Sequence, residues 1–208
     1  MKAVLFDFGG VVTTSPFEAF ARYEEASGLP DGLIRSINAT DPDTNAWAKL
    51  ERNDVDADGF ARLFEAEAAE RGHTVSGHAV LDCLAGAVRP RMVEAIRRIA
   101  ASELRVACLT NNFVPRSERE EARPETAEVM AMFDVVVESS VVGVRKPERR
   151  FYEIALDNVG VVAAEAVFLD DLGINLKTAR AMGMTTIKVT DPDDALRELS
   201  SVIGLDLG

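Results

Sequence analysis

Three aspartates and one lysine carry most of the chemistry that this sequence suggests. Asp7 follows the apolar run AVLF, the pair Asp170-Asp171 ends the run AVFL, and Lys146 precedes a proline. If the three carboxylates share one site, they repel one another unless a proton or a cation compensates their charge. One Mg²⁺ together with Lys146 would neutralise them, and Mg²⁺ prefers a few carboxylate oxygens with water and substrate phosphate. These residue types predict a magnesium site beside a phosphate, with Asp7 as an ionised nucleophile that forms an aspartyl-phosphate.

The helices and strands that position these residues can be predicted from the regular alternation of helix and strand patterns after residue 90. Helix patterns alternate there with the strand patterns LRVACLT, DVVVES, AVFLD and TTIKVT. Such alternation is typical of a parallel sheet with right-handed crossovers, and ligands of an open α/β sheet bind beyond the carboxyl ends of its strands. We therefore expect Thr110-Asn111, Ser139-Ser140 and Lys146, which we expect to open a helix, at the same edge as the aspartates. The Thr110 hydroxyl and the backbone amides of the turn Gly9-Gly10 would meet the phosphate.

A long helical block separates the first strand from the second. Residues 3–8 are typical of a buried strand, and Ser15-Pro16-Phe17-Glu18 predicts a helix start with Ser15 as N-cap and a capping box. A strand–helix–strand unit needs about 30 residues, so roughly 70 residues before the next strand are surplus. The expected fold class is α/β, a Rossmann-like parallel sheet core with an inserted all-helical cap. The core comprises residues 1–14 and 88–208, and the cap comprises residues 15–87.

The composition of the chain limits which classes of partner and which cellular compartment we expect. The 208 residues carry a formal net charge of −12, so we expect neither a nucleic acid nor an anionic membrane as a partner. No apolar run approaches the roughly 18 residues of a membrane span, and MKAVLFDFGG does not resemble a secretory signal. Cys83 and Cys108 have no metal-ligand spacing and do not suggest a disulfide framework. We expect a cytoplasmic protein, either a monomer or a homodimer.

Four stretches of the sequence resemble, in order, the four motifs of the haloacid dehalogenase (HAD) superfamily. They are FDFGGVV, LTNN, GVRKPERRFY and VFLDDLGINLKTARAMGM. The sequence is similar to the phosphatase-like N-terminal domain of soluble epoxide hydrolases and to small capped sugar-phosphate phosphatases. This resemblance implies that Asp7 is the nucleophile, that Thr110 with Asn111 holds the phosphoryl group, and that Lys146 stabilises the phosphoaspartate. The implied enzyme is a Mg²⁺-dependent hydrolase of a small phosphorylated metabolite.

The same resemblance implies a set of metal ligands and supporting residues. The implied ligands of Mg²⁺ are Asp7, the backbone carbonyl of Gly9, and Asp171 supported by Asp170. The implied supporting residues are Gly10 in the first motif and Asn175 in the fourth.

Gly9 departs from the pattern of most phosphatases that this sequence resembles. They have a second aspartate there, which protonates the leaving group and later activates water. General acid–base help is typically worth about 10²–10⁴-fold, and its loss hurts substrates with poor leaving groups most. A good leaving group such as an anomeric or acyl phosphate, a substitute acid from the cap, or water would compensate. Inactivity does not follow, because relatives with a glycine at this position include sugar-phosphate phosphatases.

Several other functions remain as alternatives. Gly9 supports a relative that binds a phosphorylated ligand without efficient turnover. A metal-independent 2-haloacid dehalogenase would also lack the second aspartate, but it would not need the pair Asp170-Asp171. A response-regulator switch would carry its acidic pair at the first strand, and a nicotinamide site is disfavoured because GGVVTT lacks the third glycine of that fingerprint.

A few further side chains have two interpretations. Arg116, Arg119 and Arg123 alternate with glutamates, which favours a solvated face over attraction of an anionic substrate. Trp47 and Phe64 are expected in the core of the cap, whereas Arg52 is left open between the site and the cap.

Overall fold

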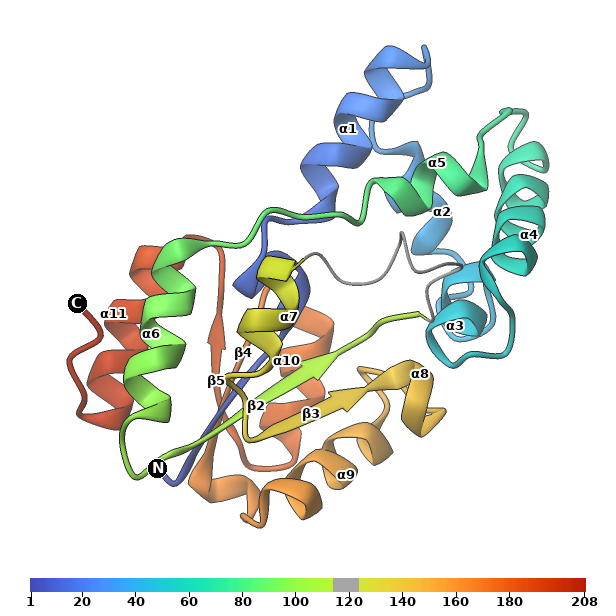
Figure 1. The fold of residues 1–208 in the computed structure, drawn as a ribbon. Coiled ribbons are helices and arrows are strands. Elements are labelled where there is room, and N and C mark those ends of the chain that lie inside the picture. The colour runs from blue at the N-terminus through green and yellow to red at the C-terminus, as the bar shows by residue number, and fades with distance from the viewer. Residues whose placement is uncertain (114–123) are drawn as a thin grey trace.

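The computed structural model describes residues 1–113 and 124–208, whose strands form a five-stranded sheet (Figure 1). All neighbouring strands pair in parallel, in the order β3-β2-β1-β4-β5. The strands are β1 (Ala3–Phe6), β2 (Arg105–Thr110), β3 (Val135–Glu138), β4 (Ala166–Asp170) and β5 (Thr185–Lys188). Their carboxyl ends therefore share one edge, which confirms the predicted α/β fold class. The arginines 116, 119 and 123 lie outside the described residues.

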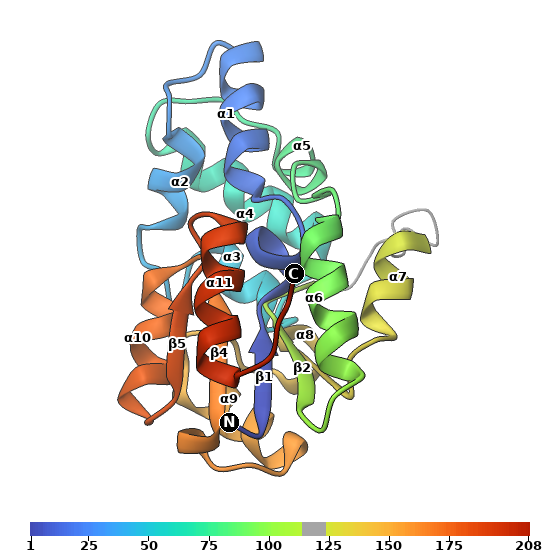
Figure 2. The ribbon, with the colours of Figure 1, turned by 90° about the vertical axis from the view of Figure 1, so that its left-hand side faces the viewer.

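Helices cover both faces of the sheet. On one face α6 and α11 lie side by side (Figure 2), and on the other lie α9 and α10. Their bounds are α6 (Pro90–Ala100), α9 (Arg149–Val159), α10 (Gly173–Ala181) and α11 (Pro192–Ile203). Shorter elements are α7 (Pro124–Met130), α8 (Ser139–Val142) and a 3₁₀ turn at Ala163–Glu165. Val4 packs toward α6 and α11 and Leu5 toward the opposite helices, so β1 is apolar on both faces.

Three local predictions differ from the structure. β1 ends at Phe6 instead of residue 8, because the Asp7 side chain accepts a hydrogen bond from Phe8 N and an irregular turn, Phe8–Val12, begins there. Lys146 does not open a helix: it lies in the turn between α8 and α9. Ser15 is the N-cap of the first helix, as expected, but its hydroxyl accepts from Phe17 N instead of forming the capping-box contact with Glu18 N.

Five helices between residues 16 and 82 form a layer beyond the carboxyl edge of the sheet (Figure 1). They are α1 (Pro16–Ala26), α2 (Leu33–Asn38), α3 (Ala46–Glu51), α4 (Ala57–Ala69) and α5 (Gly77–Asp82). This helical layer has an apolar cluster of its own, which includes Phe20, Ile34, Leu50, Phe60 and Phe64. Burial of such side chains is worth about 1.5–3 kcal/mol each, so the layer is held together largely by its own packing.

Two linkers run antiparallel where the helical layer joins the sheet. Thr14 N donates to Ala87 O at 2.8 Å, and Arg89 N donates to Val12 O at 2.9 Å. We propose this paired linker as the boundary between the core and the cap.

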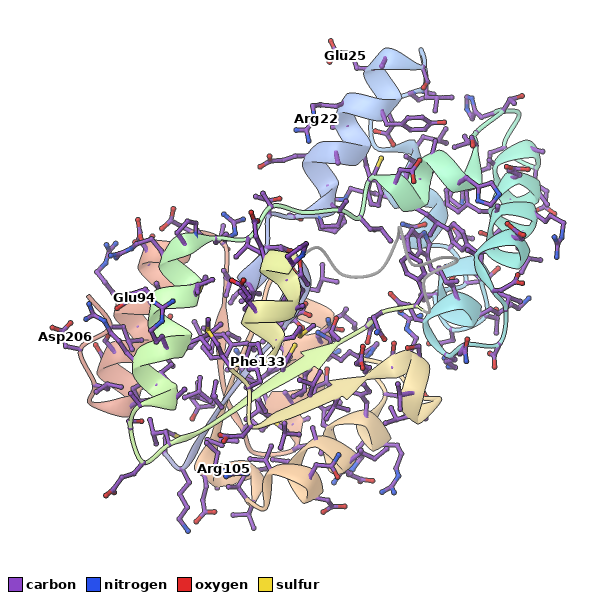
Figure 3. All side chains as sticks on the ribbon, viewed as in Figure 1. Arg22, Glu25, Glu94, Arg105, Phe133 and Asp206 are labelled. Carbon is purple, nitrogen blue, oxygen red and sulfur yellow. The ribbon has the colours of Figure 1, made fainter. Side chains whose placement is uncertain are left out.

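Charged side chains lie on the surface of the helices, and aromatic side chains pack in the interior. Figure 3 shows Arg22 and Glu25 of α1 pointing into solvent, whereas Phe133 points inward and its ring lies 6.3 Å from that of Phe6. Within the described ranges, no helix combines the length and the apolar character needed to cross a bilayer.

Candidate active site

The centre of the candidate site is a buried lysine between two carboxylates. Asp7 directly follows β1 and Asp170 ends β4, and these neighbouring strands pair with Phe6 opposite Leu169. Lys146 Nζ lies 2.7 Å from Asp7 Oδ1 and 2.9 Å from Asp170 Oδ2. The lysine side chain is 1% exposed and that of Asp170 is fully buried. Because a buried charge is stable only with partners, each of these three groups depends on the others.

The charges of the site are not balanced by the lysine alone. Burial raises the pKa of Asp7 well above its usual range, against the lowering effect of Lys146, and the negative charge of Asp170 raises it further. Burial and Asp170 raise the pKa of Asp171 to about 6. Burial lowers the pKa of Lys146, but the two adjacent carboxylates outweigh this effect and keep it above its usual range. The protein therefore holds a charged ammonium amid an excess of carboxylate, which a cation would relieve.

The geometry of the three aspartates fits a divalent cation. One oxygen from each of Asp7, Asp170 and Asp171 lies within 4.8 Å of the others. Gly10 has a φ of 81°, and a Cβ there would lie 2.3 Å from Asp171 Oδ2. Only glycine allows this close approach without strain. Oxygen ligands gathered in this way suit Mg²⁺. Ligation by the Gly9 carbonyl stays a prediction.

Asn175 holds the acidic loop after β4. Its Nδ2 donates to Asp170 Oδ2 at 3.0 Å and to Oδ1 at 3.1 Å, and Leu172 N also donates to Oδ1. Tyr152 OH in turn donates to the Asn175 carbonyl at 2.9 Å. These bonds fix the direction of the Asp170 carboxylate before any ligand arrives.

Asn111 connects three parts of the site. Its Oδ1 accepts from Lys146 N at 2.9 Å, and its Nδ2 donates to Lys146 O at 3.0 Å and to Glu51 Oε2 at 3.1 Å. Its side chain thus positions the lysine loop, and its contact with a phosphoryl group stays a prediction. Thr110 is buried beside it, and its hydroxyl makes a long contact of 3.5 Å with Asn111 O.

A pocket of about 640 Å³ opens over these residues, between the sheet edge and the helical layer. The sheet edge contributes Asp7, Gly9, Thr110, Lys146 and Asp171 to its lining. The helical layer contributes apolar side chains and two carboxylates: Phe17, Trp47, Glu51, Leu81 and Asp82. A pocket of this size holds a small molecule.

The model of the haloacid dehalogenase-like hydrolase family matches residues 1–183. The chain belongs to this family. It is therefore a HAD-like hydrolase, as the resemblance of its four motifs implies, and its parallel sheet is the fold expected from them.

Named relatives of this HAD-like hydrolase include phosphatases. Acyl-CoA dehydrogenase family member 10 of Mus musculus is 35% identical, over 99% of this chain but only 19% of the relative. Bifunctional epoxide hydrolase 2 of Sus scrofa is 29% identical, over 100% of the chain and 40% of the relative, so both relatives extend far beyond the region matched. A sesquiterpene phosphatase of Aspergillus oryzae is 29% identical over 98% of the chain and 97% of its own length.

Two solved structures share the fold. A HAD family enzyme of Bacteroides thetaiotaomicron, in complex with magnesium and inorganic phosphate, matches with a TM-score of 0.60 at 18% identity, over 90% of this chain and 93% of the other. The L-2-haloacid dehalogenase of Xanthobacter autotrophicus matches with a TM-score of 0.61 at 17% identity, over 99% and 84%. At these identities the likeness establishes the fold alone.

The predictions for three side chains of the helical layer in this HAD-like hydrolase agree with the structure to different degrees. Phe64 is fully buried in the helical layer, as expected. Trp47 packs on Phe60 at 4.7 Å between ring centroids, but it also lines the pocket. Arg52 pairs with Glu148 of the sheet domain, with Nε 2.8 Å from Oε1.

Sequence reasoning missed Glu51 and Arg145. Arg145 Nε lies 2.7 Å from Glu51 Oε2, at the point where α3 meets the turn that holds Lys146. Arg145 precedes the lysine, but nothing local in the sequence points from it to a glutamate in the helical block. Only the packing of α3 brings the two together.

Proposed function

We propose that this HAD-like hydrolase is a Mg²⁺-dependent phosphatase of a small phosphorylated metabolite and that it acts through an aspartyl-phosphate on Asp7. The observation that carries the proposal is the cluster of Asp7, Lys146 and Asp170, which are buried, with the half-buried Asp171; Asp7, Lys146 and Asp171 line the pocket. The phosphatase among the relatives and the magnesium and phosphate in the Bacteroides enzyme support it.

The residues have complementary roles in this reaction. An Asp7 carboxylate oxygen attacks phosphorus, and the bond to the leaving-group oxygen breaks as the new O–P bond forms. Lys146 and the Thr110 hydroxyl hold the phosphoryl oxygens, and water then hydrolyses the phosphoaspartate to phosphate and free Asp7. Asp7, Asp171 and the Gly9 carbonyl would hold Mg²⁺, which supplies positive charge beside the phosphoryl oxygens.

The acidic pair favours phosphate over a haloacid as the substrate. Asp170 is occupied by Lys146 and Asn175, which leaves Asp171 beside Asp7 in the pocket. A dehalogenase that works without a metal would not need a pair of carboxylates at the end of β4. The alternative is a protein that binds a phosphorylated ligand without efficient turnover. The first experiment tests this alternative.

The first experiment measures inorganic phosphate release from a panel of sugar, acyl, nucleoside and lipid phosphates, with and without Mg²⁺. We expect magnesium-dependent turnover that falls roughly 10³-fold or more in Asp7→Asn, since an amide is a poor nucleophile. Asp206→Asn is the matched control, because this exposed side chain lies near the C-terminus, away from the site (Figure 3). A flat panel for a wild-type protein that still binds Mg²⁺ would support the non-catalytic alternative instead.

A further inference from the structure

Position 9 leaves open space beside the nucleophile. Gly9 has φ of −70° and ψ of 127°, which any residue adopts, and a Cβ there would meet no heavy atom within 4 Å. Neither the backbone nor the packing forces a glycine at this position. If the reaction uses an acid, its proton has to come from another part of the pocket.

Glu51 brings a carboxylate into the same pocket from the helical layer. It is the last residue of α3, its side chain is 18% exposed, and it lines the pocket together with Asp7 and Gly9. Its Oε2 contacts Asn111 Nδ2 at 3.1 Å and Arg145 Nε at 2.7 Å. Within residues 1–113 and 124–208, its Oε1 takes part in no hydrogen bond. One oxygen is anchored to the sheet edge, and the other has no hydrogen-bond partner among these described residues.

The surroundings of Glu51 act on its pKa in opposite directions. Burial raises its pKa above the usual range. The charges of Arg145 and Lys146 from the core, the Asn111 hydrogen bond and Arg52 from the end of its own helix act in the opposite direction. Burial thus favours a protonated carboxyl, while Arg145 stabilises the carboxylate that remains when the proton leaves.

The other pocket carboxylates outside the metal group are less suited to this role. Glu138 is bonded to Asn112, whose side chain binds Ser140 and not the lysine loop, and Asp82 is exposed at the end of α5. Glu51, in contrast, accepts a hydrogen bond from Asn111, the residue directly after Thr110, and the Asn111 side chain also binds the backbone of Lys146.

We propose that Glu51 is the general acid and base of the reaction, supplied from the helical layer in place of a carboxylate at position 9. This inference rests on the proposed phosphatase function. In the first step the Glu51 carboxyl gives its proton to the leaving-group oxygen, as the bond from that oxygen to phosphorus breaks and the Asp7–phosphorus bond forms. In the second step the Glu51 carboxylate takes a proton from the water that attacks phosphorus, so Asp7 and the Glu51 carboxyl are restored.

The test compares Glu51→Gln with wild type on two esters that differ in leaving group. Glutamine keeps an oxygen for Asn111 and Arg145 but has no proton to transfer. We expect kcat/KM, which reports the steps up to phosphorylation of Asp7, to fall about 100-fold or more on a poor leaving group, a simple alkyl phosphate. The loss should be far smaller on p-nitrophenyl phosphate, whose leaving group departs without a proton. Gly9→Asp in the Glu51→Gln background should restore turnover of the alkyl phosphate.

Two outcomes would overturn the role of Glu51. Equal losses of kcat/KM on both esters would make it a positioning residue, and unchanged kcat and kcat/KM on both would remove it from the reaction. Glu148→Gln is the control for docking of the helical layer, because it removes another ion pair between the same segments and should change both esters alike. If wild type releases no Asp7-dependent phosphate even from p-nitrophenyl phosphate, the proposed function itself fails, and the acid role with it.

Discussion

The edge of the sheet and the helical layer that faces it are stabilised by different interactions. At the edge, Lys146 is pinned between Asp7 and Asp170, and Asn175 fixes Asp170 from behind. The helical layer is held by an apolar cluster, and Phe17 and Trp47 present apolar surface to the pocket. The sheet edge thus carries a preorganised set of charges, whereas the helical layer shapes the space above it and adds the carboxylate of Glu51 beside Asn111.

In the part of the chain that the structure describes, polar contacts join the two regions around one turn. Arg145 contacts Glu51 and donates from Nη1 to Pro42 O at 3.0 Å, and Arg52 pairs with Glu148. All of these contacts flank the turn of Lys146. A shift of α3 therefore acts first on the loop that carries the lysine.

The largest effect on stability is expected from Lys146→Met, which removes the positive charge between Asp7 and Asp170 at the sheet edge. The variant leaves two buried carboxylates without their cation, so we expect the free energy of unfolding at neutral pH to fall by roughly 3–5 kcal/mol. Urea denaturation without divalent cations measures it.

The pH dependence of that loss has a definite sign. The pKa of Asp7 is already raised by burial, so the folded state binds a proton more readily than the unfolded chain. Loss of the lysine raises the Asp7 pKa further, and the deficit of the variant should shrink as the pH falls below the folded pKa. A deficit that grows at low pH would contradict the buried ion pair.

A smaller effect is expected from Gly10→Ala, which tests how closely Asp171 approaches the first turn. The new Cβ would collide with Asp171 Oδ2 at a φ of 81°, so we expect a loss of roughly 1–3 kcal/mol in stability and weaker binding of Mg²⁺. Urea denaturation and a Mg²⁺ titration measure the two effects.

Gly9→Ala is the matched control for that substitution. Its φ is −70° and its Cβ would meet open space, so the stability change should stay within about 0.5 kcal/mol. Equal losses in the two variants would mean that the turn tolerates no side chain at all, and that the approach of Asp171 is not what requires glycine.

The smallest effect is expected from Arg52→Gln, which weakens the contact between the two regions. The side chains of Arg52 and Glu148 are 20% and 33% exposed, so their pair should contribute no more than about 1 kcal/mol and less in high salt. A double-mutant cycle with Glu148→Gln isolates the pair. A coupling of several kcal/mol would show that the helical layer depends on its polar contacts after all.

The sequence predicted the parallel sheet and the residues at its edge because both depend on short-range patterns. Apolar runs that end in Asp7, Thr110 and Asp170 are local signals, and a parallel topology brings strand ends together whatever the packing details are. Boundaries were less predictable. Phe8 has strand character, but the Asp7 side chain caps its N–H and begins a turn there.

What the sequence by itself determined is which groups gather at the sheet edge, because covalent order and strand direction fix them. What only the tertiary structure decided is which side chain of the helical layer reaches them. Glu51 and Asn111 lie 60 positions apart, and their contact depends on the packing of α3 against the core. No periodicity or motif encodes it, because a contact between two separately packed regions depends on shape complementarity across their whole interface.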